Sequence, residues 1–108
     1  MLRQADSNLM RGARQLKAQV ERLACGGVLT AERVTDWSSL TFSGARHRFT
    51  FRFGSDRIEK ARVFIDALPD HDFHLWGALV IEGRVMSYDY DFADRINNVT
   101  VEILTVNA

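Results

Sequence analysis

The sequence predicts an α+β fold with its elements in the order α-β-β-α-β-β, and three observations carry that prediction. Leucine recurs every seven residues up to Leu23, which indicates an amphipathic helix. A second helical pattern ends before Pro69. Segments with a period of two, most clearly Phe49–Phe53, predict strands on both sides of that second helix. We expect one domain over 1–108, with an N-terminal amphipathic helix over 1–26 and a ββαββ core over 28–108.

The first helix is predicted from its leucine spacing and from the glycines that follow it. Its leucine stripe consists of Leu2, Leu9, Leu16 and Leu23. Gly26-Gly27 ends the pattern, because glycine readily adopts the left-handed conformation found after a last helical turn. The positions between the leucines hold mostly small or polar side chains, which disfavours a long two-stranded coiled coil. We therefore expect the helix to lie across a sheet, either its own or that of a neighbouring chain.

The next two strands are expected over about 30–42 and 46–53, joined by a turn at Ser43-Gly44. The phenylalanines of Phe49–Phe53 then share one face of the sheet and point into the core. Four arginines lie on the opposite face around Trp37, namely Arg33, Arg46, Arg48 and Arg52. Guanidinium groups beside an aromatic ring suit phosphates or stacked bases, so this face is a candidate site for an anionic partner.

A second helix is expected over 56–67. Asp56 and Glu59 have the spacing of a capping box, and Pro69 ends the helix because the residue before a proline is disfavoured in helical geometry. A long hydrophobic strand over about 74–88 follows.

A turn over 91–98 leads into a last strand over 99–106, in which Val99, Val101 and Ile103 share one face. A four-stranded antiparallel sheet with two helices satisfies the whole order of elements. This connectivity resembles the ferredoxin-like βαββαβ arrangement after circular permutation. The resemblance is one of topology, and topology by itself implies no function.

The strand over 74–88 is apolar on both sides. Leu75, Leu79 and Ile81 alternate with Trp76, Ala78 and Val80. Both sides must therefore be covered, one by the second helix and the other by the first helix or a second chain. Leaving large side chains in water would cost roughly 1.5–3 kcal/mol each, and an uncovered patch of this kind marks an interface. The candidate interface residues are Trp37, Trp76, Val80, Leu104 and Val106, with Leu9 and Leu16 on the first helix.

Charge is divided by position along the chain. Up to Arg62 there are twelve Lys and Arg residues against six Asp and Glu, and from Val63 onward two against eight. The net charge of zero argues against a generic polyanion binder, while the two opposite halves suit a charged partner or a self-complementary assembly. The sequence has a single cysteine, Cys25, and neither an apolar signal segment nor an apolar run of bilayer length. We therefore expect a cytoplasmic protein.

One cluster has the residue types of a metal site, namely Asp70, His71, Asp72 and His74. Structural zinc uses four ligands, and no other Cys or His has the spacing of a partner. The aspartates Asp89, Asp91 and Asp94 lack the spacing of an EF-hand, and Asp36 with His47 lacks a nucleophile. The sequence therefore predicts solvated loops, with no metal ligand, cofactor or catalytic residue.

The sequence alone does not specify a biochemical activity. We expect a small non-catalytic domain that forms a homo-oligomer, with a dimer as the first expectation, and no membrane partner. One alternative is a small-molecule-binding domain or small enzyme with a pocket between sheet and helix, lined by Trp37, Trp76, Tyr88 and His47. A second alternative is nucleic-acid binding through the arginine and Trp37 face, with a steep dependence on salt.

Overall fold

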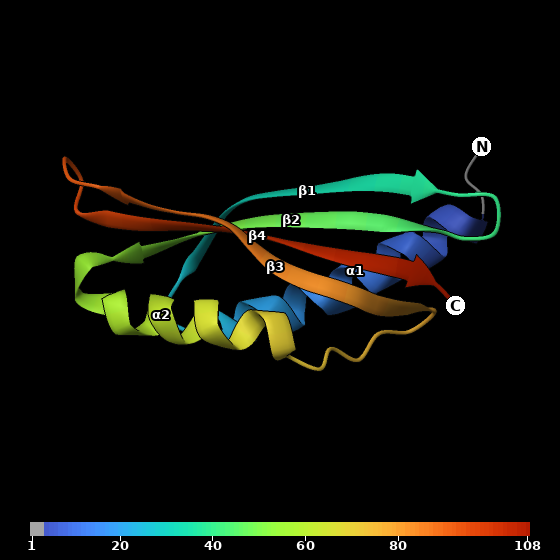
Figure 1. Ribbon diagram of the computed structural model, residues 1–108, viewed down its shortest axis with the longest axis horizontal. Helices are drawn as coiled ribbons and strands as arrows, with labels where there is room; N and C mark the ends of the chain where they lie inside the picture. Colours follow the sequence, from blue (N-terminus) through green and yellow to red (C-terminus); the bar gives the residue numbers. More distant parts are fainter. Residues whose placement is uncertain (1–3) are drawn as a thin grey trace.

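The computed structural model describes the backbone of residues 4–108 and the side chains of residues 12–108. Its elements follow the predicted order (Figure 1). They are α1 (Gln4–Leu23), β1 (Val28–Ser38), β2 (Ser43–Gly54), α2 (Ile58–Ala67), β3 (Ala78–Asp91) and β4 (Ile96–Asn107). The α+β fold class and the α-β-β-α-β-β order are therefore confirmed.

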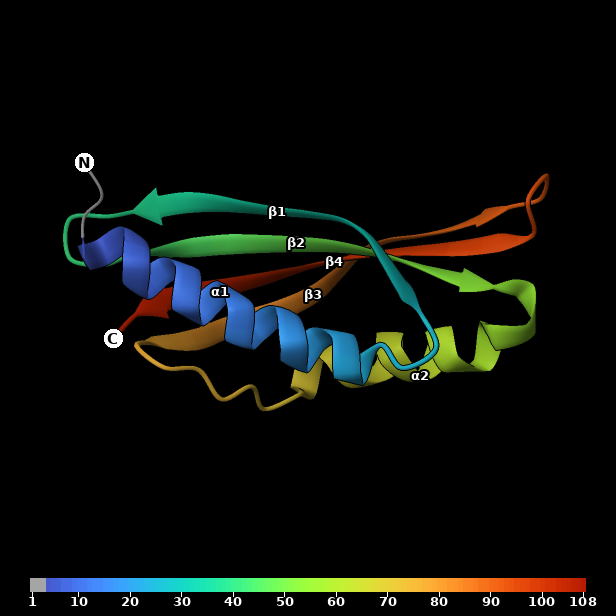
Figure 2. The same ribbon diagram turned by 180° about the vertical axis from the view of Figure 1, so that it is seen from behind.

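All four strands form one antiparallel sheet in the order β1-β2-β4-β3, which is the order that circular permutation of βαββαβ gives. The two outer strands contain bulges, in β1 between Leu29 and Ala31, and in β3 between Val80 and Glu82 and between Val85 and Ser87. Both helices lie on the same side of the sheet, so the domain has two layers (Figures 1 and 2). We call the side of the sheet without helices the open face.

The core forms where β2 and β4 meet the apolar stripes of both helices. Phe49, Phe51 and Phe53 are at most 1% exposed. The ring of Phe51 packs edge-on against Phe64 of α2, with ring centroids 5.3 Å apart. The side chains contributed by β4 are Val99, Val101 and Ile103. The predicted alternation in both strands is therefore confirmed.

Helix α1 packs on its own sheet. Leu16 and Val20 are fully buried, so Leu16 is not available to a second chain. The side chain of Leu9 lies outside the described residues. Gly26 has a φ of 94°, in the left-handed region that favours glycine, as expected after a helix. No helix in the described part of the chain is long and apolar enough to span a bilayer.

Loop 71–77 connects α2 to β3, and two glutamines of α1 fix its backbone. The Oε1 of Gln19 accepts a hydrogen bond from the backbone N–H of His74 at 2.9 Å, and its Nε2 donates to the carbonyl of the same residue. The Oε1 of Gln15 accepts from the backbone N–H of Trp76. These bonds hold the segment in an irregular conformation, so β3 begins four residues later than predicted. Trp76 lies in the loop and is 75% exposed.

The turn between β1 and β2 differs from the prediction. Residues 39–42 form it, and Ser43 and Gly44 belong to β2. The backbone N–H of Ser39 donates to the carbonyl of Phe42 at 2.7 Å, and its hydroxyl accepts from the N–H of Phe42 at 3.1 Å. The serine hydroxyl therefore closes the turn without a glycine.

The predicted capping box of α2 is not formed. A 3-10 turn over Ser55–Arg57 precedes the helix. The N-cap of α2 is Arg57, and its side chain makes no capping hydrogen bond. Glu59 pairs instead with Arg62 at 3.0 Å. Pro69 lies in the 3-10 turn that follows the helix, so its predicted end is confirmed.

The alternative in which the first helix covers the second side of β3 is wrong, because both helices lie on the same side of the sheet (Figures 1 and 2). Val80 and Val85 pack against the core beneath the helices, whereas Leu79 is 63% and Ile81 is 54% exposed. The apolar stripes of both helices pack against the side of the sheet that carries Phe49, Phe51 and Phe53. One chain therefore leaves the open face bare.

Candidate interaction surface

The open face is built in rows, because antiparallel partners place their side chains next to one another across the sheet. One row, here called the apolar row, holds Trp37, Gly44, Val106 and Leu79, one residue from each strand. Leu104 lies in the next row and is half-buried, as is Val106. Ile81, the unpaired residue of a β3 bulge, is exposed beside them.

The structure therefore brings together three of the predicted interface residues, Trp37, Leu104 and Val106. Val80 faces the helices, and Trp76 belongs to the loop. The alternation in the sequence placed Leu79 and Ile81 on the side that the second helix was expected to cover. Their true side depends on the pairing of β3 with β4, which no short-range pattern reveals.

The indole of Trp37 lies next to Gly44 and is hydrogen-bonded to β4. Its Nε1 donates to the carbonyl oxygen of Thr105 at 2.9 Å. A Cβ on Gly44 would lie 2.9 Å from that nitrogen and would overlap the same carbonyl. Glycine at this position thus allows a close approach between strands. Trp37 is half-buried and held on the sheet instead of projecting from it.

The open face is basic next to the apolar row. Arg33, Thr35, Arg46, Arg48 and Glu102 line a hollow of about 220 Å³, here called the basic hollow. The carboxylate of Glu102 accepts hydrogen bonds from Arg48 at 2.9 Å and from Arg84 at 3.3 Å. The hydrogen bond from Arg48 is the main reason why the pKa of Glu102 lies below its ordinary value. The carboxylate of Glu102 is therefore charged at neutral pH. Within residues 12–108, Arg33 and Arg46 make no ion pair.

The predicted arginine face is only partly assembled. Arg52 lies opposite Asn98, and the row of Thr50 and Thr100 separates it from the basic hollow. Glu102 already neutralises part of the positive charge in the hollow. Glu102 repels any further anionic group that enters the hollow, so the hollow accommodates fewer negative charges than its arginines alone would.

The predicted small-molecule pocket is not formed by its predicted residues. Trp37 lies on the open face, Trp76 is exposed, and the hydroxyl of Tyr88 donates to a neighbouring side chain at 3.0 Å. His47 is 2% exposed, with its Nε2 3.1 Å from the hydroxyl of Thr105. The hollow against His47 measures about 10 Å³, close to the space of one water molecule. Burial lowers the pKa of His47 to about 4.

The Asp36–His47 pair is also not formed. Val34, and not Asp36, lies opposite His47 in the strand ladder. Asp36 is exposed while His47 is buried. The two groups are therefore not arranged for proton transfer.

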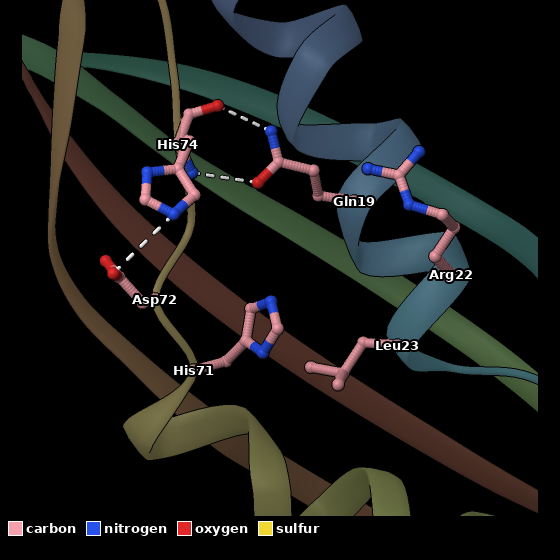
Figure 3. Close-up of a pocket in the computed structure, with 6 residues that line it drawn as sticks. All are labelled: Gln19, Arg22, Leu23, His71, Asp72 and His74. Carbon is pink, nitrogen blue, oxygen red and sulfur yellow. Dashed lines mark hydrogen bonds and ion pairs between the residues drawn. The ribbon is translucent and has the colours of Figure 1, made fainter.

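Loop 71–77 and α1 line an open hollow of about 500 Å³ (Figure 3). Its lining residues are Gln19, Arg22, Leu23, His71, Asp72 and His74. His74 lies 3.6 Å from Asp72, and both are largely exposed, whereas the ring of His71 packs edge-on against Phe73. Asp70 does not line the hollow. Among the described residues, no three metal-ligating side chains converge.

The turn between β3 and β4 exposes aromatic and acidic side chains. We call residues 89–95 the acidic tip. The carboxylate of Asp91 accepts hydrogen bonds from the backbone N–H groups of Ala93 and Asp94, so this residue shapes the turn. Phe92 is 84% exposed, and its ring packs edge-on against Tyr90 at 4.7 Å.

Comparison with known proteins finds a similar fold in a solved structure. No family model matches the chain, and no curated protein matches it. Among solved structures, it is similar to a chain of a structure described as the virion of a native gene transfer agent (GTA) particle. The TM-score is 0.54 and the sequence identity 17%, and the match covers 99% of this chain and 100% of that chain. At this identity the likeness shows a shared fold over the full length of both chains.

Proposed function

We propose that the chain is a non-catalytic structural subunit that associates with further copies of itself through the open face of its sheet. The observation that carries this proposal is the apolar row together with Ile81, because large apolar side chains gathered on an uncovered face are typical of a protein contact. A dimer is the smallest assembly that covers this face.

Burial of the exposed leucine and isoleucine supplies binding energy. Leu79 is 63% and Ile81 is 54% exposed, and full burial of such a side chain contributes roughly 1.5–3 kcal/mol. Covering their exposed parts therefore contributes on the order of 1 kcal/mol for each of them. The arginines beside them set orientation and association rate, since exposed charges add little to affinity.

The likeness in fold supports a role in assembly. The similar chain belongs to a virion particle. An exposed free cysteine, Cys25, fits assembly in the reducing cytoplasm, where we expect this protein.

Replacing Leu79→Glu and Ile81→Glu together is expected to weaken self-association at least about tenfold, or about 1.4 kcal/mol. The two carboxylates would lose the apolar contact and would have to be desolvated in the interface. Sedimentation velocity over a range of micromolar concentrations measures this change.

Val63→Glu is the matched control, because Val63 has the same exposed fraction as Leu79 but lies on α2. This variant should associate like the unmodified protein. Unmodified protein that stays monomeric over the whole range, or a double-glutamate variant that associates normally, contradicts the proposed function.

A further inference from the structure

We propose that the segment bound by the open face is the acidic tip of a second copy of this chain. This inference rests on the proposed function and names the partner surface. The two surfaces carry opposite charge.

The open face combines apolar side chains with arginines. Leu79 and Ile81 are exposed beside the basic hollow, in which Arg33 and Arg46 make no ion pair within the described residues. The hollow is smaller than the usual site for a small molecule and is the right scale for one or two side chains.

The acidic tip combines an aromatic ring with carboxylates. Phe92 is 84% exposed and lies between Asp89 and Asp94, which are both exposed. A guanidinium group binds a carboxylate through two parallel hydrogen bonds and also stacks on aromatic rings. Residues 89–95 therefore present carboxylates and an exposed aromatic ring, which are the two groups that an arginine binds, and the ring of Phe92 is apolar like Leu79.

The acidic tip cannot reach the basic hollow of its own chain. The two strands that carry the tip end at one extremity of the molecule, away from the turn between β1 and β2 (Figure 1). Asp89 lies in the row of Arg52, and Arg46 is six positions from Arg52 along β2, a span of about 20 Å. Only another copy can therefore bring the two surfaces together.

The presence of Glu102 favours this occupant over a nucleic acid. Its carboxylate already binds Arg48 and Arg84, which leaves two arginines for incoming negative charge. The acidic tip holds three aspartates and Arg95, a net charge of −2, which balances Arg33 and Arg46. A run of phosphates would bring more negative charge close to Glu102.

Two double variants test this contact. The face variant, Arg33→Glu with Arg46→Glu, and the tip variant, Phe92→Arg with Asp94→Arg, should each lose self-association at least tenfold. Because each keeps one intact surface, an equimolar mixture should form a 1:1 heterodimer in sedimentation velocity. Raising the salt concentration should weaken that heterodimer, since exposed charges are screened.

Matched controls carry the same changes elsewhere. Val63→Arg with Asp66→Arg repeats the charge change of the tip variant on exposed positions of α2, and Arg57→Glu with Lys60→Glu repeats that of the face variant. Both controls should associate like the unmodified protein.

A mixture that stays monomeric overturns the inference, as does a tip variant that associates normally. If the Leu79 and Ile81 variant still fails to associate in that case, the proposed function stands and only the partner surface is wrong. Binding of a single-stranded oligonucleotide that the face variant loses, with self-association unaffected by the tip variant, assigns the hollow to nucleic acid and also overturns the inference.

Discussion

Gly44→Ala is expected to destabilise the protein by about 3 kcal/mol, the scale seen when backbone strain and lost packing act together. The added methyl group would overlap the carbonyl oxygen of Thr105, which belongs to the neighbouring strand and cannot move alone. It would also push aside the indole of Trp37 and break its 2.9 Å hydrogen bond to that carbonyl. Urea unfolding followed by circular dichroism measures the loss.

Gly12→Ala provides the opposite control. Gly12 lies within α1, and the nearest heavy atom to an added Cβ, the carbonyl oxygen of Trp76, is 3.9 Å away. Alanine favours a helix over glycine by about 1 kcal/mol, so this variant should be more stable than the unmodified protein. Equal stability of the Gly44 and Gly12 variants would show that the approach of Trp37 to β4 does not depend on glycine.

Acidification is expected to destabilise the fold through His47. Burial lowers the pKa of this imidazole from 6.5 to about 4, so between these values the unfolded chain binds a proton that the folded chain does not. The free energy of unfolding therefore falls as the pH drops below 6.5, by about 2 kcal/mol at pH 5 and about 3 kcal/mol at pH 4. Glu102, whose pKa is lowered below its ordinary value of 4.5, adds its own loss of stability as the pH falls through about 4.5 and below.

His47→Gln keeps a hydrogen-bonding side chain near the hydroxyl of Thr105 and removes the titration. In this variant the free energy of unfolding should be nearly constant between pH 7 and pH 5. His74→Gln, at an exposed position, should keep the pH dependence of the unmodified protein. A steep loss that persists in His47→Gln would assign the effect to another group.

The sequence determined the fold through patterns that act over short distances. The alternation in Phe49–Phe53 predicted the buried side of β2, and the leucine stripe predicted the burial of Leu16, with Leu23 partly buried against the same core. Pro69 predicted the end of α2 because a proline restricts the residue before it. These signals need no knowledge of which strands are neighbours.

The surface could not be predicted in the same way. Which side Leu79 occupies depends on its pairing with Val106 and on the bulges of β3, since one extra residue reverses the alternation. Likewise, Gly44 suggested a turn, although its position is determined by the indole of Trp37. The basic hollow was foreseen as an arginine face, but Glu102 at its centre became visible only when β4 was placed beside β2.

The bulges in both outer strands restrict how copies of this protein can be joined. An incoming strand needs an uninterrupted line of backbone donors and acceptors, and two irregularities break that line along β3, whereas the one in β1 lies near its start. Fibre-like stacking by strand addition is thus disfavoured at the β3 edge, even where many copies are crowded together. Each copy would keep its own four-stranded sheet inside a larger assembly.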